Sequence, residues 1–67
     1  MKYGKIIDYN GSSGQIVDEA GNKYILSYQN ILYDNAKTGD LVQFKIEIFE
    51  TPEIKEIIAI NVKKIKE

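Results

Sequence analysis

Short apolar runs alternate with clusters of Gly, Asn and Asp along the chain, a pattern typical of short β-strands separated by turns. The clearest alternation predicts a strand over residues 40–49, because apolar and polar side chains change places at every position there. The apolar positions that should share one face are Val42, Phe44, Ile46 and Ile48. The opposite face should carry Gln43, Lys45 and Glu47.

The same signals predict four further strands, at residues 2–9, 15–18, 23–27 and 57–65. Turn clusters at 10–14 and 19–22 separate the first three. The segment 28–39 is a longer connection, with one helical turn predicted at 29–32. The last strand segment also fits a short helix, but its density of β-branched side chains favours a strand.

Five short strands can close into a barrel, which leaves little exposed sheet edge. The sequence therefore predicts one all-β domain over residues 1–67, built as a five-stranded antiparallel barrel. An SH3-like barrel is the nearest competing architecture, since the number of strands does not separate the two.

The composition excludes several kinds of chemistry. The chain has no Cys and no His, so disulfides, zinc sites of the Cys or His type and His-based acid–base catalysis are excluded. We therefore expect no metal, no cofactor, no catalytic residue and no enzyme activity. No apolar run approaches membrane-spanning length and no signal-peptide pattern opens the chain, so the expected location is the cytoplasm.

The charge balance argues against a strongly electrostatic partner. The net charge is −1, from 9 basic and 10 acidic residues, and every basic residue is Lys. A nucleic-acid-binding domain is usually basic, and Arg provides the bidentate phosphate contacts that Lys does not. The low net charge does not exclude a basic stripe on one face. The sequence contains one basic and one acidic cluster, and we interpret both as solvated surface charge. These are Lys63, Lys64 and Lys66 near the end and Glu47, Glu50, Glu53 and Glu56 before it.

Four ordered segments resemble the bacterial cold-shock domain, an OB-fold barrel that binds single-stranded nucleic acid. Residues 4–10, G-K-I-I-D-Y-N, are similar to the family pattern G-K-V-K-W-F-N. Residues 24–31, Y-I-L-S-Y-Q-N-I, correspond to its V-F-V-H-x-S-x-I, and residues 38–44, T-G-D-L-V-Q-F, to its E-G-x-x-V-x-F. The terminal A-x-N-V stands intact at residues 59–62. The resemblance implies that the core consists of Ile6, Ile16, Tyr24, Leu26, Val42, Phe44 and Val62.

The departures from the family fall in its binding motifs. The first motif, K-G-F-G-F-I, becomes S-G-Q-I at residues 13–16 and loses both Phe residues. The second loses its Phe to Ile25 and its His to Ser27, and Asp8 replaces the Trp of the first strand. Because each base stacked on an aromatic ring contributes about 1–3 kcal/mol, we expect weak binding of single-stranded RNA or DNA with little sequence preference.

The resemblance implies a role for each remaining position of the binding face. Tyr9 and Tyr28 would stack on bases, although both also fit amphipathic packing against the barrel. Lys5 and Lys37 would meet phosphates. Gln15 and Ser27 would hydrogen-bond base edges, and Ile25 would cover a base without offering a π-face. The other tyrosines are expected to be structural: Tyr3, Tyr24 and, by packing in the long loop, Tyr33.

A second hypothesis belongs to another class of function. Ile7, Val17 and Ile25 would form an apolar patch on the outer face of the sheet. Such a patch on a small domain often indicates a protein contact. The alternative function is therefore a protein-interaction module or homodimer that has lost nucleic-acid binding.

Overall fold

Five strands close into a barrel in the computed structural model, which describes residues 1–65. The strands are β1 (Lys2–Ile7), β2 (Ser13–Asp18), β3 (Lys23–Ser27), β4 (Leu41–Glu50) and β5 (Lys55–Lys64). Their order around the barrel is β1-β2-β3-β5-β4, with β4 paired back to β1. The chain is thus an all-β, five-stranded closed barrel, consistent with an OB-fold, as the sequence predicts.

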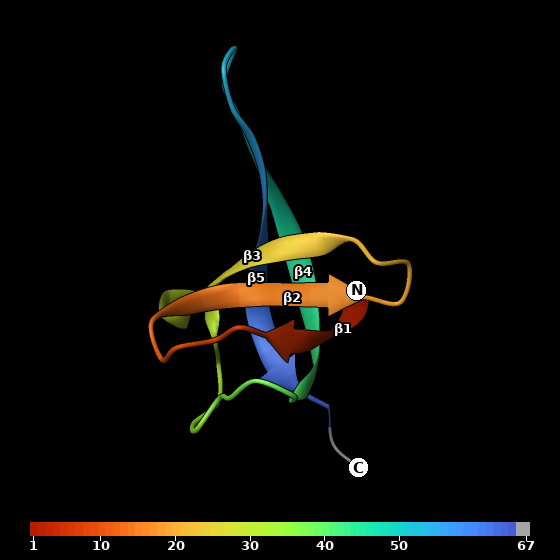
Figure 1. Ribbon diagram of the computed structural model, residues 1–67, viewed down its shortest axis with the longest axis vertical. Coiled ribbons are helices and arrows are strands. Elements are labelled where there is room, and N and C mark those ends of the chain that lie inside the picture. The colour runs from red at the N-terminus through yellow and green to blue at the C-terminus, as the bar shows by residue number, and fades with distance from the viewer. Residues whose placement is uncertain (66–67) are drawn as a thin grey trace.

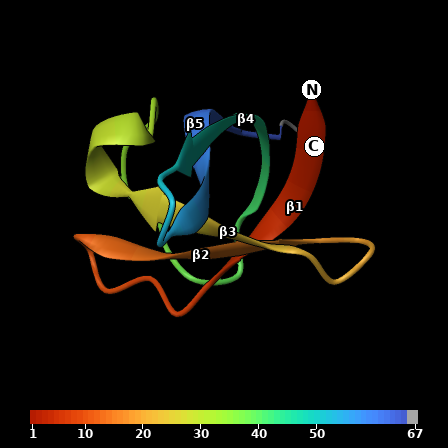
Figure 2. The ribbon, with the colours of Figure 1, turned by 90° about the horizontal axis from the view of Figure 1, so that it is seen from above.

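The barrel is mixed and not purely antiparallel, which corrects one detail of the prediction. β3 and β5 run parallel and meet at the pair Ile25–Ile58, while the other neighbouring strands pair antiparallel. β1, β2 and β3 run crosswise to β4 and β5 (Figures 1 and 2). A parallel pair is unavoidable here, because strand direction cannot alternate at every step around a closed ring of five strands.

The boundaries of several elements differ from those predicted. β1 ends at Ile7, two residues early, because Asp8 takes a left-handed backbone conformation with φ of 52°. The predicted helical turn at 29–32 is a 3-10 helix, η1 (Tyr28–Asn30). β2 and β5 each begin two residues before the predicted start.

The predicted core is confirmed. All seven predicted positions are buried, and Ala59 completes the cluster. The rings of Tyr24 and Phe44 meet edge to face with centroids 5.2 Å apart, a favoured aromatic geometry. Tyr24 is therefore structural, as predicted.

Gly4 lies at the position where β1 pairs with β2 on one side and with β4 on the other. It is paired with Asp18 of β2 and with Val42 of β4. A Cβ atom added here would stand 2.6 Å from the Val17 carbonyl oxygen and 2.7 Å from the Ile16 side chain. Only glycine allows the backbones to approach this closely, so Gly4 lets the barrel close.

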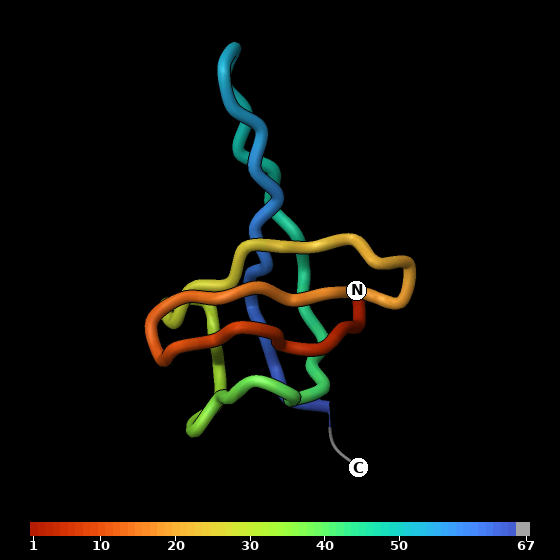
Figure 3. The backbone as a smooth tube through the Cα atoms, in the orientation of Figure 1, coloured from red at the N-terminus to blue at the C-terminus, as the bar shows by residue number. Residues whose placement is uncertain are grey.

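β4 and β5 continue past the barrel as a two-stranded ribbon, residues 45–57, which we call the arm (Figures 1 and 3). The four apolar positions predicted to share a face of β4 have different environments. Val42 and Phe44 are buried in the barrel, whereas Ile46 and Ile48 are exposed on the arm. The alternation of β4 is as predicted, but the strand is longer than the barrel that its apolar face fills.

Candidate nucleic-acid interface

The outward side chains of β1, β2 and β3 form one continuous surface, which we call the outer face. Because side chains alternate along a strand, the burial of Ile6, Ile16 and Leu26 directs their neighbours outward. The members of the outer face are Tyr3, Lys5, Ile7, Ser13, Gln15, Val17, Lys23, Ile25 and Ser27. It contains four of the seven predicted site residues: Lys5, Gln15, Ile25 and Ser27.

Two lysines flank Val17 in one cross-strand row of the outer face. Val17 is paired with Lys5 on β1 and with Lys23 on β3, and both lysines are exposed. Adjacent strands lie about 4.8 Å apart, so the two backbones are about 10 Å apart. Sequence reasoning missed Lys23 as a binding residue, and the register of β2 and β3 is the signal that identifies it.

The next row combines aliphatic side chains with one amide. Gln15 is paired with Ile7 on one side and with Ile25 on the other, and Ile25 in turn meets Ile58 of β5. Ile25 is exposed, while Ile7, Gln15 and Ile58 are half-buried. This row can cover an apolar ring and offer it one hydrogen-bonding group, but it provides no aromatic platform.

Tyr28 stands at the end of this face, where β3 passes into η1. Ser27 is paired with Ser13, and the Tyr28 N–H donates to the Ser12 carbonyl oxygen at 3.0 Å. The backbone of Tyr28 is therefore fixed to the β1–β2 turn, while its side chain is 56% exposed. Tyr28 therefore presents a solvent-accessible ring from a backbone position that is held in place, and base stacking requires an accessible ring.

Tyr9 has a different environment. Its side chain is partly buried against the core, and its N–H donates to Thr38 Oγ1 at 2.9 Å. Its backbone lies against Gly14, where an added Cβ would stand 2.7 Å from the Tyr9 Cα. Tyr9 therefore packs against the barrel, so of the two predicted stacking residues only Tyr28 is exposed.

Lys37 belongs to a loop that a buried carboxylate holds in place. Asp40 Oδ2 accepts from the Tyr33 hydroxyl at 2.9 Å and from the Lys37 N–H at 3.1 Å. Burial would raise the pKa of Asp40, but these hydrogen bonds outweigh it and hold the pKa below its usual range. Burial and the contact with Asp40 raise the pKa of Tyr33. Tyr33 thus packs in the loop as predicted, and the exposed Lys37 lies next to Thr38, at the Tyr9 end of the barrel.

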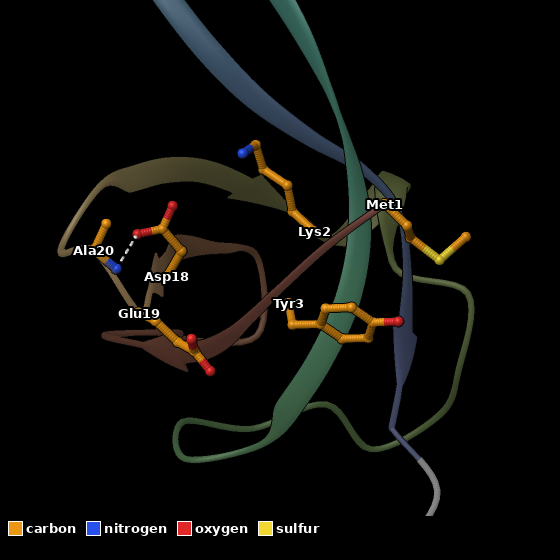
Figure 4. Close-up of a pocket in the computed structure, with 6 residues that line it drawn as sticks. All are labelled: Met1, Lys2, Tyr3, Asp18, Glu19 and Ala20. Carbon is orange, nitrogen blue, oxygen red and sulfur yellow. Dashed lines mark hydrogen bonds between the residues drawn. The ribbon is translucent and has the colours of Figure 1, made fainter.

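Tyr3 does not have the structural role expected of it. It is 54% exposed, as accessible as Tyr28, but it lies toward the opposite end of β1. It borders a hollow of about 350 Å³ that has mainly apolar walls, including Val17, Leu41 and Ile65. A second hollow of about 360 Å³ lies beside the turn after β2, where Met1 and Tyr3 point away from Asp18 (Figure 4).

Residues 1–65 contain no group of three or more carboxylates, His or Cys placed to hold a metal ion. In the same residues no helix has the length and apolar character needed to cross a bilayer. Lys63 and Lys64 of the predicted basic cluster are exposed at the end of β5, and Lys66 lies outside the described residues. No protein-family model matches the chain, and a search of curated proteins finds no match either.

Proposed function

We propose that this barrel is a cold-shock-like OB-fold module that binds single-stranded RNA or DNA weakly, with little sequence preference, in the cytoplasm. The observation that carries the proposal is an exposed ring, Tyr28, at one end of the outer face and two lysines in a row across its other end, with five residues, about 16 Å of strand, between Lys23 and Tyr28. Tyr28 would stack on a base, and Lys5 and Lys23 would contact phosphates on either side of Val17. The order of strands around the barrel and the resemblance described above support the same interpretation.

The remaining predicted residues have supporting roles in this proposal. Gln15 and Ser27 would hydrogen-bond base edges, and Ile25 would cover a base. Lys37 would contact the backbone of a strand that continues past Tyr28. Tyr9 would pack against the core and would not stack on a base, because its side chain is half-buried.

Energetic arithmetic explains why we propose weak binding. One stacked base contributes about 1–3 kcal/mol, whereas a Kd of 1 μM requires about 8 kcal/mol. The net charge of −1 limits the electrostatic part, which usually dominates non-specific binding. We therefore expect a Kd weaker than about 1 μM at moderate salt.

The stacking role is tested by titrating labelled single-stranded oligonucleotides, as DNA and as RNA, and following fluorescence anisotropy. Tyr28→Ala should weaken binding about 5- to 150-fold, the equivalent of one stacked base. Phe49→Ala is the matched control, because Phe49 is 51% exposed, close to the 56% of Tyr28, and lies on the arm away from the outer face. Weaker binding in Tyr3→Ala with no change in Tyr28→Ala would contradict the assignment and move the site to the hollow beside Tyr3.

The lysine row is tested by the dependence of affinity on salt. Removing both Lys5 and Lys23 by substitution with Ala should lower the slope of log K against log salt by about 2, since each lysine would neutralise one phosphate. The double variant Lys55→Ala with Lys63→Ala removes the same charge away from the outer face and should leave the slope nearly unchanged. Equal slopes in the two double variants would show that the lysine row is not the phosphate site.

The protein-interaction alternative rests on the aliphatic row from Ile7 to Ile58. If no oligonucleotide binds even at low salt, this row becomes the main candidate surface, as an exposed patch of this kind fits a protein partner. Ile25→Lys would then abolish the contact without disturbing the core, since Ile25 points outward.

A further inference from the structure

The arm exposes apolar side chains that the barrel does not cover. Ile46, Ile48, Phe49 and Ile54 are all exposed there. A two-stranded ribbon is marginally stable alone, and at least three strands with a packed face, or a covering element, are needed for independent stability. The arm of a single chain is therefore an incomplete sheet.

Within the described residues both edges of the arm have unpaired backbone groups, and the β4 edge is the longer of the two, because β3 pairs with β5 at Ile58. At the two ends of β4, the odd-numbered residues bond toward β5: Ile65 N–H donates to the Leu41 carbonyl at 3.0 Å, and Thr51 N–H to the Ile54 carbonyl at 2.7 Å. By alternation, the N–H and C=O groups of Ile46, Ile48 and Glu50 point the opposite way. That side is covered by β1 only as far as the pair Lys2–Phe44, and in residues 1–65 no strand pairs with β4 beyond it.

The charge of the arm excludes a polyanion as the occupant of this edge. The arm carries Glu47, Glu50, Glu53 and Glu56 against only Lys45 and Lys55. Nucleic acid and anionic lipid would both be repelled. An unpaired strand edge is a template for another β-strand, so the partner that fits the β4 edge is a β-strand.

We propose that the arm joins two copies of this chain by antiparallel pairing of their β4 edges, with Ile48 on the two-fold axis. In this register Ile48 lies opposite Ile48 of the second copy, and Ile46 lies opposite Glu50. Ile46, Ile48 and Glu50 of each β4 strand are then all paired with a residue of the second copy. Since Ile48 is paired with Ile57 within each chain, a row of four isoleucines crosses the resulting four-stranded sheet.

The charge pattern and the position of the proline select this register over its two neighbours. Hydrogen-bonded pairs must join residues that both point to the edge, so the register can change only in steps that keep even-numbered residues opposite each other. Two registers neighbour the proposed one. With Ile46 opposite Ile48, Glu47 lies directly opposite Glu47, and like charges in this position are destabilising. With Ile48 opposite Glu50, Ile46 lies opposite Pro52, which has no N–H to donate. The proposed register places Glu47 opposite Phe49 and puts no like charges face to face.

Disulfide trapping tests the register directly, because the chain has no Cys of its own. Two Cα atoms in a hydrogen-bonded pair are about 5.5 Å apart, within the range that a disulfide spans. Ile48→Cys should therefore oxidise rapidly to a covalent dimer of twice the 7.7 kDa chain on a non-reducing gel. Ile54→Cys is the matched control, because Ile54 is 52% exposed and Ile48 is 55%. In the proposed register the two Ile54 positions are about 25 Å apart, so this variant should form no disulfide and should run at the mass of a single chain on the non-reducing gel.

Sedimentation of the unmodified chain gives the second readout. We expect a dimer, and we expect Ile48→Lys to convert it to a monomer with an unchanged far-UV circular dichroism spectrum, since Ile48 lies outside the core. Ile25→Lys, on the outer face, should leave the dimer intact. A strictly monomeric chain at high concentration, or equal cross-linking of Ile48→Cys and Ile54→Cys, would overturn the proposal. Dissociation of the dimer in Ile25→Lys but not in Ile48→Lys would assign the contact to the outer face instead.

Discussion

Asp18 is the polar residue that fixes one end of the outer face. Its carboxylate accepts from the Tyr24 hydroxyl at 2.7 Å and from the N–H groups of Ala20 and Asn22, each at 2.9 Å. The hydrogen bond from Tyr24, supported by those from Asn22 and Ala20, outweighs desolvation and lowers the pKa of Asp18 to about 2. One side chain thus connects the turn after β2 to a core tyrosine.

The depressed pKa of Asp18 makes part of the stability dependent on pH. The unfolded-state pKa is about 3.9, so this contribution is present above that value and is lost as the pH falls toward the folded-state value. Asp18→Asn should therefore be less stable than the unmodified chain at about pH 5, and the difference should shrink toward about pH 2. Urea unfolding at both pH values measures it.

Glu19→Gln is the control for net charge, since it removes the neighbouring carboxylate instead. We expect its stability to follow that of the unmodified chain across the same pH range. A constant difference between Asp18→Asn and the unmodified chain from about pH 5 to about pH 2 would contradict the role given to the Asp18 charge.

At the scale of the element, β5 depends on a bulge at Asn61. Gln43 pairs with Lys63, whereas Lys45 pairs with Ile60. Two residues of β5, Asn61 and Val62, therefore lie opposite the single residue Phe44. Asn61 has a φ of 51°, in the left-handed region, where Asn is tolerated better than most residues. The bulge allows Ala59 and Val62, three positions apart, both to face the core.

Substitution at Asn61 tests whether this conformation is required. Asn61→Ala should lower the free energy of unfolding by about 1–2 kcal/mol, the cost of the left-handed conformation for a residue with a Cβ. Asn61→Gly should be close to neutral, because glycine accepts a positive φ. Urea denaturation of both variants gives the comparison. Equal losses in Asn61→Gly and Asn61→Ala would show that the Asn side chain, and not the backbone conformation, is what β5 needs.

At the scale of the whole molecule, the barrel buries its apolar side chains, whereas the arm exposes most of its own. The chain has two phenylalanines, and they separate the two parts: Phe44 is 1% exposed in the barrel and Phe49 is 51% exposed on the arm. A domain of 67 residues has a total stability of only about 3–10 kcal/mol. A single core side chain can therefore decide whether the barrel folds.

Truncating each phenylalanine should have unequal effects. Phe44→Ala should cost about 3–5 kcal/mol and leave the chain largely unfolded or close to it. Phe49→Ala should change the stability by less than about 0.5 kcal/mol when measured at low protein concentration, where self-association does not contribute. Thermal unfolding followed by circular dichroism distinguishes them, and comparable losses would mean that the arm is part of the folding core.

The candidate site could be predicted only in part from the sequence. Lys5, Gln15, Ile25 and Ser27 lie on one face as expected, because alternation along a strand is a local property. Tyr9 and Tyr28 look alike in sequence, yet Tyr9 is half-buried and Tyr28 exposed. Lys23 joins the face because Val17 pairs with it, and pairing across strands is not visible in one strand's own pattern.

The five strands and their apolar faces follow from the local pattern of the sequence, because the period of two and the turn residues act over a few positions, and the resemblance to the cold-shock domain implied the core. The parallel pairing of β3 with β5, and the length of β4 that remains outside the barrel, could be read only from the folded chain. Both follow from closure: which strands meet, and where a strand leaves its neighbours, depend on residues far apart in the chain. The same local pattern therefore buries Phe44 and exposes Ile48 four residues later.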